Sequence, residues 1–340
     1  MKRTFTFAAG LFATALVWTP AHSQTTLTAS SWVPPRHPLT ADILVPWTKA
    51  VEKATQGRVK FQVLPKAPVK APQTFDAVKD GIVDVSYTVH GYTPGRFVLT
   101  KMTEFGFLGD SAESISVAYQ RMYAKHLAKF DEHKGVKVIA VFSHGPGHMY
   151  TTKTRLDSLA DLAGMKIRVG GGVVNDVTKA LGANPLLKPA SQSFEILNSG
   201  VADGIFFPGE SIAGFKLTGV IRYANLVPGG LYNVSFVMMM NPAKFAALPK
   251  QDRDAIDKVS GDYFTHLAGK AWDAADRAGI AAMKKAGIDV KTASPAMVAA
   301  MKAKTDPIEL AWYREIKGMG LDGAALMKEF RAEIEKASGK

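Results

Sequence analysis

The chain contains no cysteine among its 340 residues. Disulfides therefore cannot stabilise it in any compartment, and thiolate metal sites and cysteine nucleophiles are excluded. Beyond the N-terminal segment, no apolar stretch is long enough to span a bilayer. The chain is long enough to bury a large core without covalent cross-links, and its length favours two domains.

Signatures of the common enzyme classes are missing as well. We find no Gly-x-Ser-x-Gly elbow, no phosphate loop and no metal-ligand pair on a plausible helix. The run Gly170-Gly171-Gly172 is not a dinucleotide fingerprint, because Asn175 stands where the third spaced glycine would be. Asp84 and Asp203 could be read as a catalytic carboxylate pair, but a structural role at two helix-to-strand corners is the better interpretation. We therefore expect no enzyme and no cofactor.

The formal net charge is +12, to which Lys2 and Arg3 contribute two positive charges. Lysines and arginines are spread along the chain without a dense run or an aromatic-interleaved basic stretch, so we expect no nucleic-acid partner. A diffuse positive field helps an anionic solute to arrive. It is equally consistent with a surface that only maintains solubility.

The N-terminus has the pattern of a secretory signal peptide. Met1-Lys2-Arg3 precedes an apolar stretch from Phe5 to Trp18, and Ala21-His22-Ser23 places small residues where a signal peptidase reads them. We expect residues 1–23 to be removed after Ser23. The mature protein is then expected to be soluble and periplasmic.

Strand and helix patterns alternate along the rest of the chain. Strands are expected at 26–30, 58–64, 83–89, 136–142, 165–169, 205–207 and 234–240. Helices are expected at 38–55, 74–81, 111–130, 173–181, 193–198 and 251–285, with two more before the C-terminus. Pro46 should kink or split the first of these helices.

One pattern occurs in both halves. Thr74-Phe75-Asp76 leads through a helix to Gly81 and Asp84, and Ser193-Phe194-Glu195 leads in the same way to Gly200 and Asp203. We infer an α/β fold with two similar lobes, each a mainly parallel sheet flanked by helices. Facing lobes of this kind form a cleft that can close about a hinge.

Arg168 is the strongest candidate for a ligand contact. It ends the apolar run from Met165 to Val169, and three glycines and a helix start follow at once. A guanidinium offers a planar fork that holds a carboxylate through two hydrogen bonds. Unpaired N–H groups at the helix start would add positive potential. The sequence therefore predicts a carboxylate site, the alternative being an ordinary ion pair beside a glycine turn.

Several segments resemble the solute-binding proteins of tripartite ATP-independent periplasmic (TRAP) transporters, the DctP-type family. Together they are fairly specific, and their order and spacing fit along nearly the whole mature chain. They are Thr55-Gln56-Gly57-Arg58-Val59, Gly81-Ile82-Val83-Asp84, Asp161 to Arg168, Leu181-Gly182-Ala183-Asn184-Pro185 and Gly200-Val201-Ala202-Asp203-Gly204.

The resemblance implies a two-lobed periplasmic binding protein fold with a long helix joining the lobes and a helical C-terminus. Lobe I is expected to comprise 24–150 plus about 238–265, and lobe II 151–237 plus about 266–340 with the inter-lobe and C-terminal helices. The resemblance also implies a receptor that closes on a small organic anion and passes it to the small and large TRAP membrane subunits. It places the family's carboxylate-binding arginine at Arg168. Open alternatives are a receptor for another transporter or a sensor and, less favoured, a secreted enzyme.

The chain departs from the family pattern after Asp203-Gly204. Many members carry Gln-Glu-Asn-Pro there, with an asparagine that helps to hold the ligand, whereas this chain has Ile205-Phe206-Phe207-Pro208. Phe207 removes a polar partner and adds an aromatic wall. We therefore expect a ligand with one carboxylate and an apolar or aromatic body rather than a C4-dicarboxylate.

Other candidate ligand contacts lie in loops after strands or near the expected site. Each has a structural alternative: a rigid loop for Tyr92 and Arg96, and lobe core for Trp32. His144 and His148 suit loop hydrogen bonds better than a metal site, because Gly145-Pro146-Gly147 opposes a helix. The candidates added to Arg168 and Phe207 are Trp32, Tyr92, Arg96, His144, Glu210 and Tyr232.

Overall fold

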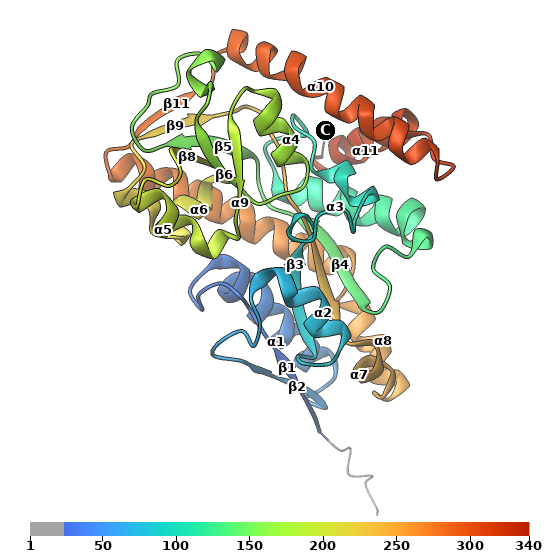
Figure 1. Cartoon of the computed structure of the whole chain (residues 1–340). Helices are drawn as coiled ribbons and strands as arrows, with labels where there is room; N and C mark the ends of the chain where they lie inside the picture. The colour runs from blue at the N-terminus through green and yellow to red at the C-terminus, as the bar shows by residue number, and fades with distance from the viewer. Residues whose placement is uncertain (1–23, 340) are drawn as a thin grey trace, which may run out of the picture.

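The structure is a computed structural model that describes residues 24–339. The expected signal peptide lies outside these residues. Two β-sheets with helices packed around them form two lobes, as Figure 1 shows. Within the described range, none of the helices combines the length and the apolar character needed to cross a membrane.

Lobe I contains a five-stranded sheet in the order β2-β1-β3-β10-β4. β10 pairs antiparallel with both of its neighbours, whereas β1 pairs parallel with β2 and β3. The strands are β1 (Thr25–Ala29), β2 (Val59–Val63), β3 (Val85–Val89), β4 (Lys137–Ser143) and β10 (Ser235–Met240).

Lobe II contains a six-stranded sheet in the order β11-β9-β5-β8-β6-β7. β5 is antiparallel to both β8 and β9, and the remaining pairs are parallel. The strands are β5 (Gly147–Thr151), β6 (Lys166–Val169), β7 (Asn184–Leu187), β8 (Gly204–Pro208), β9 (Tyr223–Leu226) and β11 (Asp289–Thr292).

Each sheet is therefore mixed but mainly parallel, as expected, because all its strands except β10 or β5 run in one direction, and the chain path explains this exception. The chain leaves sheet I after β4 and enters sheet II as β5, and it returns from β9 to sheet I as β10. The strands that follow these two crossings, β5 and β10, lie antiparallel to their neighbours, whereas β11, which enters sheet II from lobe I later in the chain, pairs parallel with β9. We propose lobe boundaries at these crossings, residues 144–146 and 227–234.

The helices cover both sheets and connect the lobes. They are α1 (Val45–Ala54), α2 (Thr74–Lys79), α3 (Ala112–Met122), α4 (Val173–Ala180), α5 (Ser193–Asn198), α6 (Gly209–Gly214), α7 (Pro242–Ala246), α8 (Lys250–Lys258), α9 (Asp262–Lys285), α10 (Pro295–Lys317) and α11 (Gly323–Ala337). Single turns of 3-10 or π geometry lie between them, including η1 (Leu39–Leu44), η3 (His90–Tyr92), η4 (Leu99–Thr103) and η5 (Tyr123–Leu127).

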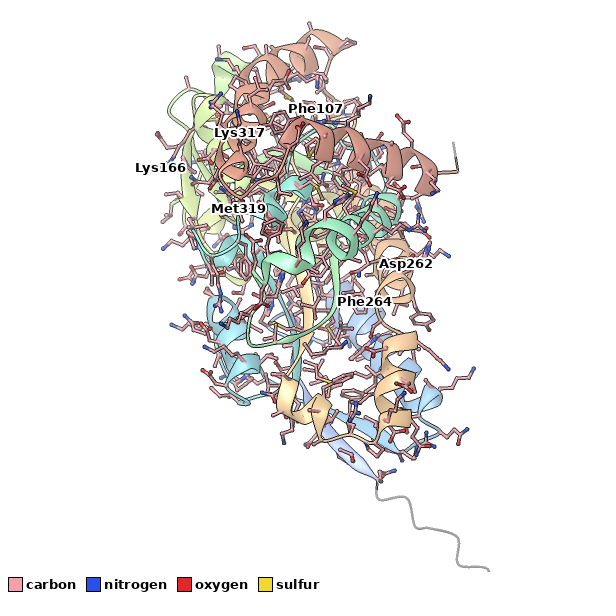
Figure 2. The ribbon with its side chains drawn as sticks, turned by 90° about the vertical axis from the view of Figure 1, so that its right-hand side faces the viewer. Phe107, Lys166, Asp262, Phe264, Lys317 and Met319 are labelled. Atoms are coloured by element: carbon pink, nitrogen blue, oxygen red, sulfur yellow. The ribbon has the colours of Figure 1, made fainter. Side chains whose placement is uncertain are left out.

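Helix α9 is the third connection between the lobes. It packs on α3 and β4 on the side of lobe I and on α6 and β11 on the side of lobe II. Figure 2 shows Asp262 and Phe264 at its start. The helix expected over 251–285 is interrupted, because the chain turns between α8 and α9 at Gly261, whose φ is +54°.

The helix expected over residues 38–55 is split, as we predicted from the position of Pro46. Residues Leu39–Leu44 form a π-helical turn, and α1 begins at Val45 with Pro46 in its first turn. A proline is tolerated there because the N–H it lacks has no partner within the helix.

Asp84 and Asp203, the equivalent aspartates of the pattern found in both halves, have the same structural role. Asp84 accepts hydrogen bonds from the backbone N–H and the hydroxyl of Thr28 at 2.7 and 2.9 Å. Asp203 accepts from the N–H of Lys166 at 2.8 Å. Each carboxylate thus binds the backbone of a neighbouring strand, β1 or β6, at equivalent positions in separate lobes.

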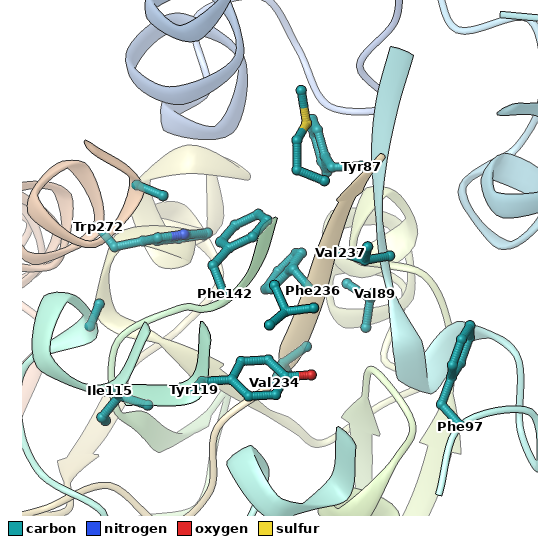
Figure 3. Packing of buried hydrophobic residues seen from close by; sticks show 14 of the residues in the cluster. Tyr87, Val89, Phe97, Ile115, Tyr119, Phe142, Val234, Phe236, Val237 and Trp272 are labelled. Carbon is teal, nitrogen blue, oxygen red and sulfur yellow. The ribbon is translucent and has the colours of Figure 1, made fainter. Parts of the chain in front are cut away.

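The core of lobe I is centred on β10. Phe236 stacks on Phe142 of β4 with ring centroids 4.9 Å apart, and Trp272 of α9 lies 6.2 Å from Phe236. Figure 3 shows these rings with Val89 and Val234 close by. Trp272, Val89, Val234 and Phe236 also line the cavity between the lobes, so the same packing that stabilises lobe I shapes the site.

Candidate functional site

A cavity lies between the lobes. Most of its walls are aromatic or aliphatic. The lining residues are Trp32, His37, Leu39, Val89, Tyr92, His144, Arg168, Gly170, Ala190, Phe207, Pro208, Glu210, Ser211, Phe215, Tyr232, Val234, Phe236 and Trp272.

Arg168 is buried in this wall, with 3% of the residue exposed. Its Nε and Nη2 both donate to the carbonyl of Lys188, at 2.9 and 2.7 Å. Its guanidinium carbon lies 4.4 Å from the centre of the Phe207 ring. These contacts fix the plane of the guanidinium and leave the N–H groups at Nη1 for another acceptor.

Burial lowers the pKa of Arg168, and the neighbouring Tyr92 and Tyr232 oppose that shift. Arginine has so high an intrinsic pKa that the side chain stays charged. Among the residues that line the cavity and are described, Arg168 is the one permanently cationic side chain. A buried cation of this kind is strongly stabilised by a paired anion.

Two tyrosines flank the guanidinium. The Tyr92 hydroxyl accepts the N–H of Ala190 at 3.0 Å, so its own proton is available to donate. Burial raises the pKa of both Tyr92 and Tyr232, which keeps the two phenols neutral. They can therefore act as neutral donors beside the arginine.

The start of α4 does not face an empty anion site, which corrects one part of the sequence interpretation. The N–H of Val173 donates to the buried carboxylate of Glu104 at 2.8 Å. Ser235 donates its hydroxyl to the other oxygen of the same carboxylate. The helix N-terminus thus binds a carboxylate of the protein itself. Glu104 is distant in sequence, so the local glycine pattern gave no sign of it.

Two of the three glycines, Gly171 and Gly172, instead allow the lobes to approach each other. A β-carbon on Gly172 would lie 2.2 Å from a Glu104 oxygen, and one on Gly171 would lie 2.3 Å from the carbonyl oxygen of Gly91 in η3. Both glycines have positive φ, +85° at Gly171 and +73° at Gly172. Close backbone contact across the cleft therefore requires glycine here.

Replacing Gly172 by alanine should lower stability and weaken ligand binding together. Gly164→Ala is the matched control, because Gly164 has the same φ of +73° but open space around its α-carbon. Calorimetry should show that both variants lose stability from the left-handed backbone, about 1–2 kcal/mol. Gly172→Ala should lose more and should also bind ligand more weakly. Equal losses in the two variants would contradict a role in lobe contact.

Seven of the eight candidate residues from the sequence lie together at the cavity, and ligand contact remains a prediction for each. They are Trp32, Tyr92, His144, Arg168, Phe207, Glu210 and Tyr232. Phe207 lies in β8 and forms the wall next to Arg168, while Trp32 packs between Tyr87 and Tyr92 with ring centroids 5.5 and 5.6 Å away.

Arg96 is the exception, and we withdraw it from the candidate site. Its Nη1 pairs with Asp76 at 3.0 Å, and its guanidinium lies 3.8 Å from the centre of the Phe75 ring. It does not line the cavity. The structural alternative, an anchored loop, describes it better.

His144 and His148, both expected in a loop, have separate environments. His144 Nδ1 bonds the carbonyl of Gly145, and burial lowers the pKa of His144 to about 4. His148 lies in β5 rather than in a loop, and its Nδ1 accepts the N–H of Val227 at 3.0 Å. Among the described residues, no three metal-binding side chains gather around them or elsewhere.

Comparison with known proteins identifies the class. Residues 29–315 match the model of bacterial extracellular solute-binding protein, family 7, DctP. The chain therefore belongs to this family, and it is a TRAP solute-binding protein with a fold shared by solved TRAP structures. Its homologues are solute-binding proteins rather than enzymes.

Three solved structures are similar over most of both chains. A TRAP periplasmic solute-binding protein from Bordetella bronchiseptica, with bound (R)- and (S)-mandelate, is 46% identical, with a TM-score of 0.90 over 92% of this chain and 99% of that one. One from Rhodoferax ferrireducens, with copurified benzoate, is 30% identical, with a TM-score of 0.88 over 93% and 99%. One from a marine metagenome, with 3-hydroxybenzoate, is 34% identical, with a TM-score of 0.87 over 93% and 99%.

Proposed function

We propose that this chain is a periplasmic receptor that binds an aromatic monocarboxylate between its lobes. Arg168 holds the carboxylate, and Phe207 forms a wall against the ring. The observation that carries this proposal is a buried permanent cation, the one such side chain among the described residues of a cavity whose other walls are largely aromatic and aliphatic. The aromatic acids bound by three similar solute-binding proteins support the same ligand class.

The charge distribution of the cavity opposes a dicarboxylate. A second carboxylate would have to be buried without a second permanent cation among the described lining residues. Burying an unpaired anion costs several kcal/mol in a protein interior. Glu210, which is buried in the same wall, would add repulsion if it were ionised.

The receptor works by a shift between open and closed forms. A ligand that touches both lobes only in the closed form favours closure through its higher affinity for that form. Tyr92 of lobe I and Arg168 of lobe II lie at the same end of the cavity, so a carboxylate there contacts both lobes. We propose that the closed receptor then docks on the small and large TRAP membrane subunits and releases the acid to them.

Isothermal titration of the mature protein with benzoate and succinate tests this function. The protein should bind benzoate with a stoichiometry of one, and succinate at least about thirtyfold more weakly, because a second carboxylate stays unpaired. Tight binding of succinate with weak binding of benzoate would contradict the proposal. Conversion of benzoate to a product during the titration, checked by chromatography, would instead indicate an enzyme.

A further inference from the structure

A second polar group of atoms lies at the other end of the cavity wall from Arg168. Next to the guanidinium of Arg168 the wall is formed by the ring of Phe207. The ring of Phe215 follows, and the centroids of the Phe207 and Phe215 rings are 5.6 Å apart. The ring of His37 follows, 4.9 Å from that of Phe215. Two aromatic rings thus separate the cationic end from the end at His37.

Three polar atoms at this end are buried and make no hydrogen bond to any described residue. They are Nε2 of His37, Oε2 of Glu210 and Nε1 of Trp272. The first two are 3.6 Å apart, which is too long for a hydrogen bond between them. Their side chains are 1% and 2% exposed. All three residues line the cavity, so a polar group of the ligand can form the hydrogen bonds that these three atoms lack within the protein.

The hydrogen-bonding capacity of these atoms can be assigned. His37 Nδ1 accepts the N–H of Leu39 at 3.2 Å, so the proton of the neutral ring is on Nε2. Burial lowers the pKa of His37 to about 4, which keeps that ring neutral. Glu210 Oε1 accepts the hydroxyl of Ser211, and burial raises the pKa of Glu210 to about 8. Near neutral pH this end therefore offers two N–H donors and a carboxyl group, without net charge.

We propose that His37, Glu210 and Trp272 form a subsite for a hydroxyl group on the ring of the aromatic acid, remote from its carboxylate. The hydroxyl oxygen accepts from His37 Nε2 or Trp272 Nε1, and the hydroxyl shares a further hydrogen bond with the carboxyl of Glu210, in which the protonated Oε2 donates or, with the carboxyl proton on Oε1, the hydroxyl donates to Oε2. The inference rests on the proposed function, because it assumes that Arg168 holds the carboxylate at the opposite end.

Other substituents fit this end less well. A methyl group would leave buried polar atoms unpaired, which is unfavourable. A second carboxylate would bring an anion beside the carboxyl of Glu210 with no permanent cation among the described residues of this end. A hydroxyl is neutral, both donates and accepts, and is close in size to a methyl group.

Affinities for benzoate, the 3- and 4-hydroxybenzoates and the matching methylbenzoates test the subsite by titration calorimetry. In the unaltered protein, the better hydroxybenzoate should bind about tenfold more tightly than both benzoate and the methylbenzoate of the same position. Glu210→Leu should remove this preference for hydroxyl over methyl or reverse it. Glu210→Gln should keep part of it, because the amide still donates and accepts. Glu195→Gln, on an exposed helix position, is the matched control and should keep it in full.

The results of these titrations distinguish failure of the proposed hydroxyl subsite from failure of the proposed aromatic-acid function on which it rests. Binding of benzoate without any gain from a hydroxyl group would overturn the subsite and leave the proposed function standing. Survival of the full hydroxyl preference in Glu210→Leu would also overturn it. Failure of all these acids to bind would overturn both proposals. His37→Phe gives an independent second variant, and it should lose the same preference if it folds.

Discussion

Arg168→Ala should lower the affinity for benzoate by about a hundredfold to a thousandfold or more. Leaving one member of a buried charge pair without its partner costs about 3–5 kcal/mol. In this variant the unpaired member is the ligand's carboxylate, facing Phe207 and two neutral tyrosines. Titration calorimetry measures the loss, and circular dichroism checks that the variant is folded.

Two further variants make the interpretation specific. Arg168→Lys should also lose much of the affinity, because one ammonium cannot reproduce the planar fork that bonds Lys188 and still faces a ligand. Arg96→Ala is the matched control, since Arg96 pairs with Asp76 outside the cavity. Near-native affinity in Arg168→Ala, or an equal loss in Arg96→Ala, would show that the carboxylate is held by other groups.

The contribution of Glu210 and Asp276 to the free energy of unfolding of the ligand-free protein should fall by about 2–3 kcal/mol between pH 6.5 and 9. Burial raises the pKa of Glu210 to about 8 and that of Asp276 to about 7. An acid whose pKa is raised by folding keeps its proton in the folded state, so unfolding releases that proton. Stability therefore decreases as pH rises towards the folded pKa and becomes level above it.

The histidines at the site act in the opposite direction, but only at the acidic end of this window. Burial lowers the pKa of His37, His144 and His148 to about 4 in the folded state, whereas an unfolded histidine titrates near its ordinary pKa of about 6.5, so these rings are almost fully neutral in both states above about pH 7.5. Urea denaturation at several pH values measures the slope. Glu210→Gln should flatten it, whereas the exposed Glu195→Gln should leave it unchanged. A slope that is the same in Glu210→Gln as in the unaltered protein would contradict a buried, protonated Glu210.

Local patterns predicted most of the secondary structure, and they failed where long-range pairing decides. The strands β5, β7, β9 and β11 were not expected, and β5 and β7 carry glycine or proline, which are disfavoured in strands. They form because a neighbouring strand is already in place to pair with them. The same long-range effect makes both sheets mixed, since β5 and β10 each enter a sheet after a crossing from the other lobe.

The candidate site shows the same difference between what local sequence patterns predict and what long-range packing decides. Arg168 and Phe207 could be found from the sequence, because a strand end, a glycine run and a departure from a family pattern mark them. Trp272 lies in an alanine-rich helix far along the chain, and Phe215 follows a short helix. Nothing in their local sequence indicates that they meet Arg168 at one cavity. Glu104 was missed for the same reason, and it changed the interpretation of the α4 N-terminus.

A crystal structure of the mature protein with benzoate tests the central claim most directly. We expect the benzoate carboxylate within hydrogen-bond distance of the Arg168 guanidinium, with the ring against Phe207 and the lobes closed around it. A benzoate carboxylate held by other groups, with Arg168 bonded only to Lys188, would contradict the account.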